Sequence, residues 1–133
     1  MLDEGDEKVS PSANERKTIL VVEDEELVRM AVLDELQERG LEALEARHAM
    51  AALSILESDR PVDLVIADIG LPGLDGTRLV SMARELRPEL KVLFLTGYPI
   101  DPGTEVPPRT KFVEKPVDLN VLAMMAQEML REA

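Results

Sequence analysis

Short apolar runs alternate with longer segments of helical period along most of the chain. Runs that are apolar or that alternate with a period of two predict strands at 18–22 (TILVV), 41–46 (LEALEA), 62–67 (VDLVIA), 91–95 (KVLFL) and 111–115 (KFVEK). Apolar residues that recur every three or four positions predict helices at about 25–39, 49–58, 77–86 and 119–131. Strands therefore alternate with helices from residue 17 onward.

That alternation favours a parallel sheet covered by helices on both faces, because a helical crossover returns the chain to start the next strand in the same direction. The runs at 18–22, 62–67 and 91–95 are continuously apolar, which is typical of central strands buried on both faces. We predict a doubly wound α/β fold in which every strand delivers its carboxyl end to the same edge. Ligand sites in such sheets lie at that edge.

The first residues follow a different pattern. Residues 1–16 (MLDEGDEKVSPSANER) are polar, mostly charged and without periodicity, as expected of a disordered acidic tail or linker. We therefore predict one folded domain, residues 17–133, with no output domain attached.

Composition narrows the function. The chain of 133 residues has 45% hydrophobic but only 2% aromatic residues, so its core must be aliphatic. It contains no cysteine, which excludes disulfides and thiolate zinc sites. A net charge of −12 argues against nucleic-acid binding, because phosphate backbones attract clustered Lys and Arg. Without an apolar run long enough for a membrane span or a signal peptide, we expect a cytoplasmic protein that does not bind membranes.

Five side chains that carry chemistry stand at the predicted strand ends. Glu23 and Asp24 follow the first strand, Asp68 the third, Thr96 the fourth and Lys115 the last. Like charges about 5 Å apart repel by roughly 3 kcal/mol at an effective dielectric near 20, so three clustered acids need a raised pKa or a cation. Mg²⁺ suits such oxygen ligands. A hydroxyl and an amine beside them would hold the oxygens of a phosphoryl group.

Each of these residues also has an ordinary explanation. An Asp at a strand end often caps the following turn or helix, and adjacent acids favour a helix N-terminus. A Lys before a proline is usually a solvated side chain. These explanations do not predict that the acids, the hydroxyl and the amine meet at one edge.

Four motifs in this order carry a family resemblance: ILVVEDEE, DLVIADIGLPGLDG, VLFLTG and FVEKP. From about residue 17 to residue 132 the chain resembles the receiver domain of two-component response regulators (CheY-like). The resemblance implies a five-stranded (βα)5 sheet of order 2-1-3-4-5. It also implies that Asp68 takes a phosphoryl group from a phosphohistidine, and that the partner is a sensor histidine kinase or a histidine phosphotransfer protein. A downstream protein target would read the phosphorylated state.

By the same resemblance, Mg²⁺ is held by Glu23, Asp24, Asp68 and the backbone carbonyl of Gly70. The domain then acts as a signalling switch rather than as an enzyme, and promotes only its own phosphorylation and dephosphorylation.

The resemblance assigns the remaining positions as well. Thr96 and Lys115 match the hydroxyl and amine that contact the phosphoryl group, and Phe112 matches the aromatic switch position. It also implies a cis peptide bond between Lys115 and Pro116.

The sequence departs from the family pattern between the fourth and fifth strands. Residues 97–110 (GYPIDPGTEVPPRT) carry four prolines where a receiver places its fourth helix. Each interior proline costs a helix about 3 kcal/mol. We predict that this helix is absent or reduced to one turn, and that signal readout goes through loop ordering.

A second departure concerns the lifetime of the phosphoryl group. Gly70 and Tyr98 stand two residues beyond Asp68 and Thr96, at positions that tune this lifetime. We expect Tyr98 to cover part of the acyl phosphate and Gly70 to leave one approach open to water.

Two other functions stay open. A degenerate receiver would bind partners without phosphorylation, although it would more naturally have lost Asp68 or Lys115. A Mg²⁺-dependent phosphatase would carry a second Asp where Gly70 stands.

Two further features stay open as well. His48 is expected to be a surface residue rather than a phosphoryl carrier. Val121 and Met124, which lie off the apolar stripe of the last helix, are either ordinary exposed residues or a partner face.

Overall fold

The computed structural model describes residues 16–71, 73–99, 103 and 105–132. The predicted tail therefore lies outside the described residues, except for Arg16. The elements, in chain order, are β2 (Thr18–Val22), α1 (Glu26–Glu38), β3 (Glu42–Ala46), α2 (Ala49–Glu57), β4 (Leu64–Asp68), α3 (Gly76–Leu86), β5 (Lys91–Thr96), β6 (Thr110–Glu114) and α4 (Leu119–Arg131).

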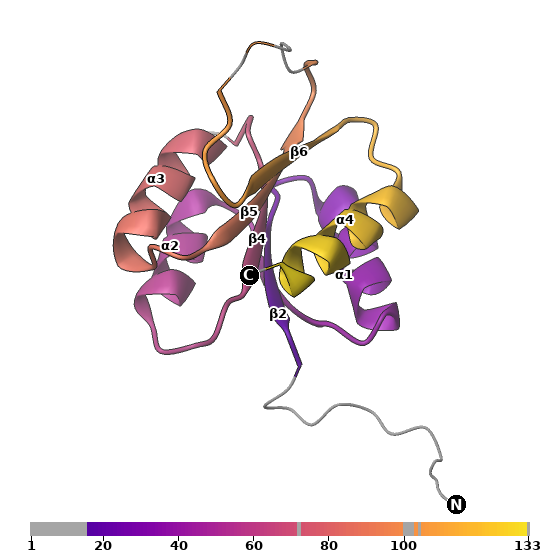
Figure 1. Cartoon of the computed structure of the whole chain (residues 1–133), viewed down its shortest axis with the longest axis horizontal. Coiled ribbons are helices and arrows are strands. Elements are labelled where there is room, and N and C mark those ends of the chain that lie inside the picture. The colour runs from indigo at the N-terminus through magenta and orange to yellow at the C-terminus, as the bar shows by residue number, and fades with distance from the viewer. Residues whose placement is uncertain (1–15, 72, 100–102, 104, 133) are drawn as a thin grey trace, which may run out of the picture.

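The strands form one parallel sheet in the order β3-β2-β4-β5-β6. Counted from the first strand, this is the predicted order 2-1-3-4-5, and the α/β fold is confirmed. Helices α2 and α3 cover one face of the sheet, and α1 and α4 cover the other (Figure 1). The three continuously apolar runs form the central strands β2, β4 and β5, as their composition predicted.

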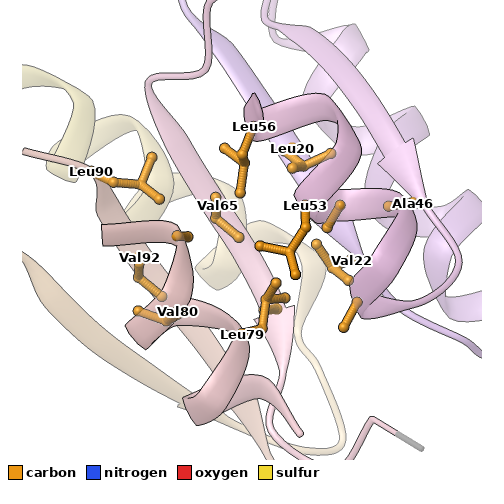
Figure 2. Packing of buried hydrophobic residues seen from close by; sticks show 14 of the residues in the cluster. Leu20, Val22, Ala46, Leu53, Leu56, Val65, Leu79, Val80, Leu90 and Val92 are labelled. Atoms are coloured by element: carbon orange, nitrogen blue, oxygen red, sulfur yellow. The ribbon is translucent and has the colours of Figure 1, made fainter. Parts of the chain in front are cut away.

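Strand alternation divides the core into two clusters, one on each face. Beneath α2 and α3 the strands contribute Leu20, Val22, Val65, Val92 and Phe94, and the helices contribute aliphatic side chains such as Leu53 and Leu79 (Figure 2). Beneath α1 and α4 the core includes Ile19, Val21, Leu64, Ile66, Leu93 and Leu95. Both clusters are almost entirely aliphatic, as the low aromatic content required.

The connection from β5 to β6 lacks the usual crossover helix in its described part. None of residues 97–99, 103 and 105–109 is helical. This confirms the prediction made from the prolines at 99, 102, 107 and 108, whose rings and missing N–H groups oppose a continuous helix.

Side chains cap three of the helices. Asp75 accepts a hydrogen bond from the backbone N–H of Arg78 at 2.9 Å, and Asp118 accepts one from Val121 at 3.1 Å. His48 caps α2 through its Nδ1, which accepts from the Ala51 N–H at 3.1 Å. His48 is exposed, as expected, and has a local structural role.

Strand boundaries differ slightly from those predicted. Asp68 and Thr96 are the last residues of β4 and β5 rather than the first residues beyond them, and Lys115 directly follows β6. The Lys115–Pro116 peptide bond is cis, as the resemblance implied. No helix in the described part of the chain has the length and apolar character of a membrane span.

Candidate functional site

Asp68 lies at the carboxyl end of the central strand β4, with only 6% of its surface exposed. Its Oδ1 accepts a hydrogen bond from the Gly70 N–H at 2.9 Å, and its Oδ2 accepts one from Lys115 Nζ at 2.6 Å. The start of α3 packs against the same strand end, where a Cβ on Gly76 would lie 2.6 Å from the Asp68 carbonyl oxygen. The Gly70 N–H and the Lys115 ammonium therefore hold the carboxylate, and the packing of Gly76 holds the strand end that carries it.

Two further carboxylates lie beside Asp68. One oxygen from each of Glu23, Asp24 and Asp68 lies within 4.8 Å of the others. Glu23 is buried and Asp24 is exposed, so the cluster opens to solvent on the side of Asp24. The structure thus brings together the three acids that the sequence placed at neighbouring strand ends.

Glu23 is the acid of this cluster whose ionised form is disfavoured by burial. Burial raises its pKa to about 7, a hydrogen bond from the Glu25 N–H partly opposes this, and the charge of Asp68 adds to the rise. Its Oε1 is buried and has no hydrogen-bond partner among the described residues. An unsatisfied carboxylate oxygen within a cluster of acids fits a hard divalent cation, which binds oxygen ligands.

Lys115 supplies the positive charge of the site. Its partial burial acts to lower its pKa, but the hydrogen bond and charge of Asp68, together with the charges of Glu23 and Glu25, outweigh that effect. The pKa of Lys115 therefore lies above its ordinary value, and the amine is a cation at neutral pH.

Three residues that the sequence assigned to the site are Thr96, Tyr98 and Phe112. Among the described hydrogen bonds, none joins their side chains to the three acids or to Lys115. The Thr96 hydroxyl accepts from the Tyr98 N–H at 3.1 Å and donates to the Tyr98 carbonyl at 3.2 Å. Tyr98 is 80% exposed. Phe112 stacks on Phe94 with ring centroids 5.4 Å apart, deeper along β6.

One residue of this region was not predicted. Arg29 of α1 is 3% exposed, and its Nη1 donates to the backbone carbonyl of Glu23 at 2.9 Å. Its Nε donates to Glu45 Oε1 at the end of β3 at 2.8 Å. Arg29 therefore connects the carboxyl ends of strands β2 and β3, next to the acidic pair Glu23 and Asp24. In the sequence, Arg29 stands three and seven residues before the apolar Val32 and Leu36, and this spacing does not reveal its partners.

The family model of the response regulator receiver domain matches residues 19–127 of this chain. The chain belongs to this family. Receiver domains are signalling domains of two-component systems. The match runs from the first strand into the last helix and includes every residue of the site described above.

Two relatives of this chain are proteins of different kinds, a sensor kinase and a response regulator receiver protein. The chain is 38% identical over 119 residues to the sensor kinase CckA of Brucella abortus strain 2308, covering 86% of this chain but 13% of that protein. It is 30% identical over 117 residues to the response regulator receiver protein CpdR of the same organism, covering 86% of this chain and 97% of CpdR. The chain therefore spans a small part of one relative and nearly all of the other.

Solved structures agree with this assignment. The crystal structure of the receiver domain of the hybrid histidine kinase CckA matches with a TM-score of 0.76 at 36% identity, covering 86% of this chain and 99% of that one. A CheY-like receiver from Methanospirillum hungatei JF-1 matches with a TM-score of 0.75 at 28% identity, covering 87% and 94%. The chain is also 29% identical over 80 residues to the sporulation initiation phosphotransferase F of Bacillus subtilis strain 168, covering 60% of this chain and 64% of that protein.

Proposed function

We propose that this receiver is a phosphoryl-accepting switch with Asp68 as the acceptor. The supporting observation is the arrangement around Asp68, whose carboxylate lies between a lysine ammonium at 2.6 Å and two further acids. The phosphoryl donor is a phosphohistidine on a sensor histidine kinase or histidine phosphotransfer protein. The reaction takes place in the cytoplasm and requires no nucleic acid or membrane.

In the transfer step, an Asp68 carboxylate oxygen attacks the phosphorus of the phosphohistidine. The bond from nitrogen to phosphorus breaks, and its electron pair stays on the imidazole. The buried end of β4 holds the attacking carboxylate in a fixed direction, which reduces the entropy cost of the reaction. The other ring nitrogen of the phosphohistidine carries a proton during transfer, so the products are an acyl phosphate on Asp68 and a neutral imidazole on the donor.

Glu23, Asp24, Asp68 and the Gly70 carbonyl would hold a Mg²⁺ ion at this edge. When bound, the ion supplies positive charge opposite the phosphoryl oxygens. The unpartnered Oε1 of Glu23 supports this assignment, because a ligand would satisfy an atom that is otherwise buried at a cost. The Gly70 N–H bonds Asp68, which keeps this turn close to the carboxylate.

Lys115 and Thr96 would bind the phosphoryl oxygens after transfer. Lys115 moves from Asp68 Oδ2 to the phosphoryl group, and the Thr96 hydroxyl exchanges its Tyr98 partners for a phosphoryl oxygen. Phe112, on the neighbouring strand, then changes its packing and conveys the state of the site to a downstream target. In this order of events, Thr96 and Phe112 are the residues that switch conformation.

The mass of the intact protein tests the proposal directly. After incubation with Mg²⁺ and acetyl phosphate, we expect one added phosphoryl group. The addition should be absent in Asp68→Asn and in wild type treated with a chelator. A protein that gains no mass but still binds a beryllium fluoride complex has a formed site that requires its own kinase. A protein that does neither is a degenerate receiver that binds partners without phosphorylation.

Tyr98 and Gly70 should set the lifetime of the phosphoryl group. The Tyr98 ring is exposed but anchored at its backbone to Thr96, from where it can fold over the acyl phosphate. We expect Tyr98→Ala to shorten the half-life of phosphorylated Asp68, measured from the decay of the added mass. An unchanged half-life would remove Tyr98 from this role.

A further inference from the structure

A groove lies over β5 and β6, beside the connection whose described residues form no helix. Its walls are one stripe of α3 and the adjacent sheet face, and its volume is 290 Å³. The lining residues are Thr77, Val80, Ser81 and Arg84 from α3, Phe94 from β5, and Pro107, Thr110 and Phe112 from the β6 side. The α3 residues follow the spacing i, i+3, i+4 and i+7, so one complete stripe of this helix faces the groove.

The floor of the groove is aromatic, which is unusual in this chain. The protein has two phenylalanines and one tyrosine, and both phenylalanines lie here, stacked with an interplanar angle of 25°. Phe94 is 5% exposed, whereas Phe112 is only partly buried. Aromatic rings provide large contact areas, and pairs of them favour association beyond simple burial.

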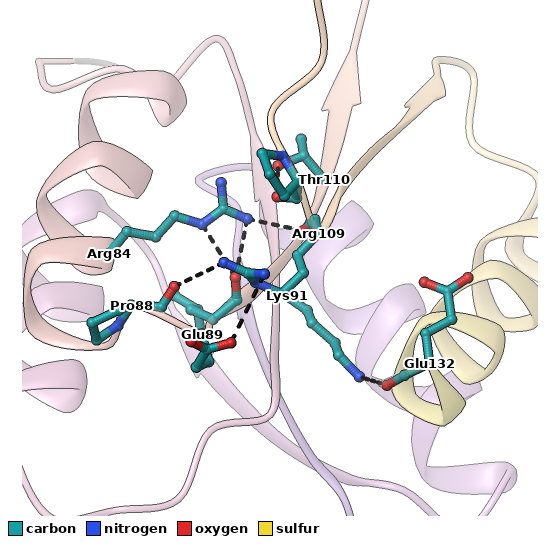
Figure 3. A network of polar contacts seen from close by, with 9 residues as sticks. Arg84, Pro88, Glu89, Lys91, Arg109, Thr110 and Glu132 are labelled. Carbon is teal, nitrogen blue, oxygen red and sulfur yellow. Dashed lines mark hydrogen bonds and ion pairs between the residues drawn. The ribbon is translucent and has the colours of Figure 1, made fainter.

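One end of the groove is cationic. Arg84 lines the groove, and Figure 3 shows its guanidinium beside that of Arg109. Burial, and then the charge of Arg109, lower the pKa of Arg84. Arg84 donates to the carbonyls of Leu90 and Arg109 and forms no ion pair within the described part of the chain.

Arg109 is only weakly neutralised. The described ion pairs give it one acidic partner, Glu89, at 3.8 Å, and the side chain of Glu89 is 89% exposed. Of these two adjacent guanidinium groups, Arg84 has no carboxylate partner among the described ion pairs and Arg109 has Glu89 alone, in a chain that contains 27 acidic and 15 basic residues. The local charge is opposite to the charge of the whole protein, which is −12.

We propose that this groove binds an acidic amphipathic segment of a partner protein, with an apolar side chain over Phe94 and Phe112 and a carboxylate at Arg84. Charge complementarity supports this occupant, because carboxylates pair well with guanidinium groups at an interface. A second copy of the chain, with its large negative charge, would meet repulsion over most of its surface. Phe112 is also the proposed switch residue, so on that proposed function phosphorylation of Asp68 should change the affinity of this groove.

Selection from a displayed library of random short peptides tests the proposal on the unphosphorylated full chain. We expect the selected peptides to combine an apolar residue with an acid about one helical turn away. Ser81→Glu places a like charge in the groove and should weaken them roughly tenfold or more. Ser81→Lys should leave binding equal or stronger. Ser54→Glu is the matched control, because it adds the same charge at an exposed position of α2.

NMR shifts caused by the selected peptides should cluster at Val80, Phe94 and Phe112. Peptides that lack acids, that shift α1 instead, or that tolerate Ser81→Glu would overturn the proposal. Two results would assign the groove to other occupants and also overturn it. One is a wild-type dimer in sedimentation that Ser81→Glu dissociates. The other is a full chain that selects no peptide, which is expected if its own acidic residues 1–15 fill the groove.

Discussion

The two faces of the sheet are covered unequally. Helices α1 and α4 bury Leu93, Leu95 and Val113 on one face of β5 and β6, with at most 7% of each residue exposed. On the other face α3 covers β5, but the Phe112 side of β6 borders an open groove. The same two strands therefore have a closed face and a partly open face.

This difference shows how a receiver keeps its sheet order when the described part of one crossover connection has no helix. The register pairs Phe94 with Phe112, and their stacked rings cover part of the strand surface that a helix would bury. The closed face holds β6 in place through α4. One face can therefore provide stability while the other remains available for binding.

Truncation of one core residue on each face should give the largest contrast. Leu95→Ala removes a fully buried side chain from the closed face and should cost about 3 kcal/mol of unfolding free energy, with Phe112→Ala costing roughly half of that. The ring of Phe112 is already partly exposed, so less burial is lost. Urea denaturation of both variants measures the two values. Equal losses would mean that the groove face is as closed as the other.

The acidic site at the strand ends contains a destabilising group, Glu23. Its folded pKa of about 7 lies above the ordinary 4.5, so the folded protein loses stability as the pH rises between these values. Glu23→Gln should therefore be more stable than wild type by up to about 3 kcal/mol near pH 8, and similar to it near pH 4. Thermal unfolding at both pH values, without divalent ions, measures this difference.

The exposed acid Glu26 provides the control for that experiment. Glu26→Gln lies in the first turn of α1 and should show no comparable gain near neutral pH. Addition of Mg²⁺ should stabilise wild type more than Glu23→Gln. If Glu23→Gln shows the same stability difference at both pH values, its effect comes from packing and not from ionisation.

The smallest expected effect is on the open face. Ser81→Glu changes an exposed residue of α3, so its unfolding free energy should stay within about 0.5 kcal/mol of wild type. The same denaturation experiment measures it. A larger loss would show that the groove wall contributes to stability, and would weaken the distinction between the two faces.

Sequence patterns predicted the sheet well because they depend on local chemistry. The run LVIA before Asp68 is typical of a strand buried on both faces, and the prolines after Thr96 oppose a continuous helix. Parallel strands then bring Glu23 and Asp68 to one edge regardless of side-chain detail.

The contacts of Arg29 and the open groove could not be predicted in this way. Arg29 bonds the Glu23 carbonyl and the Glu45 side chain, which are brought together only when β2 and β3 pair. The cationic end of the groove likewise requires α3 and the start of β6 to meet. Such contacts arise from tertiary structure, which periodicity does not specify.

Gly76 affects how the domain tolerates sequence change. Any side chain there would collide with the backbone of Asp68 and Ile69, although Gly76 has no proposed role in phosphoryl transfer. Substitutions at this position would displace either α3 or the end of β4. In a complete mutational scan of the domain, position 76 should therefore be nearly as intolerant as Asp68, the proposed phosphoryl acceptor, and for a purely steric reason.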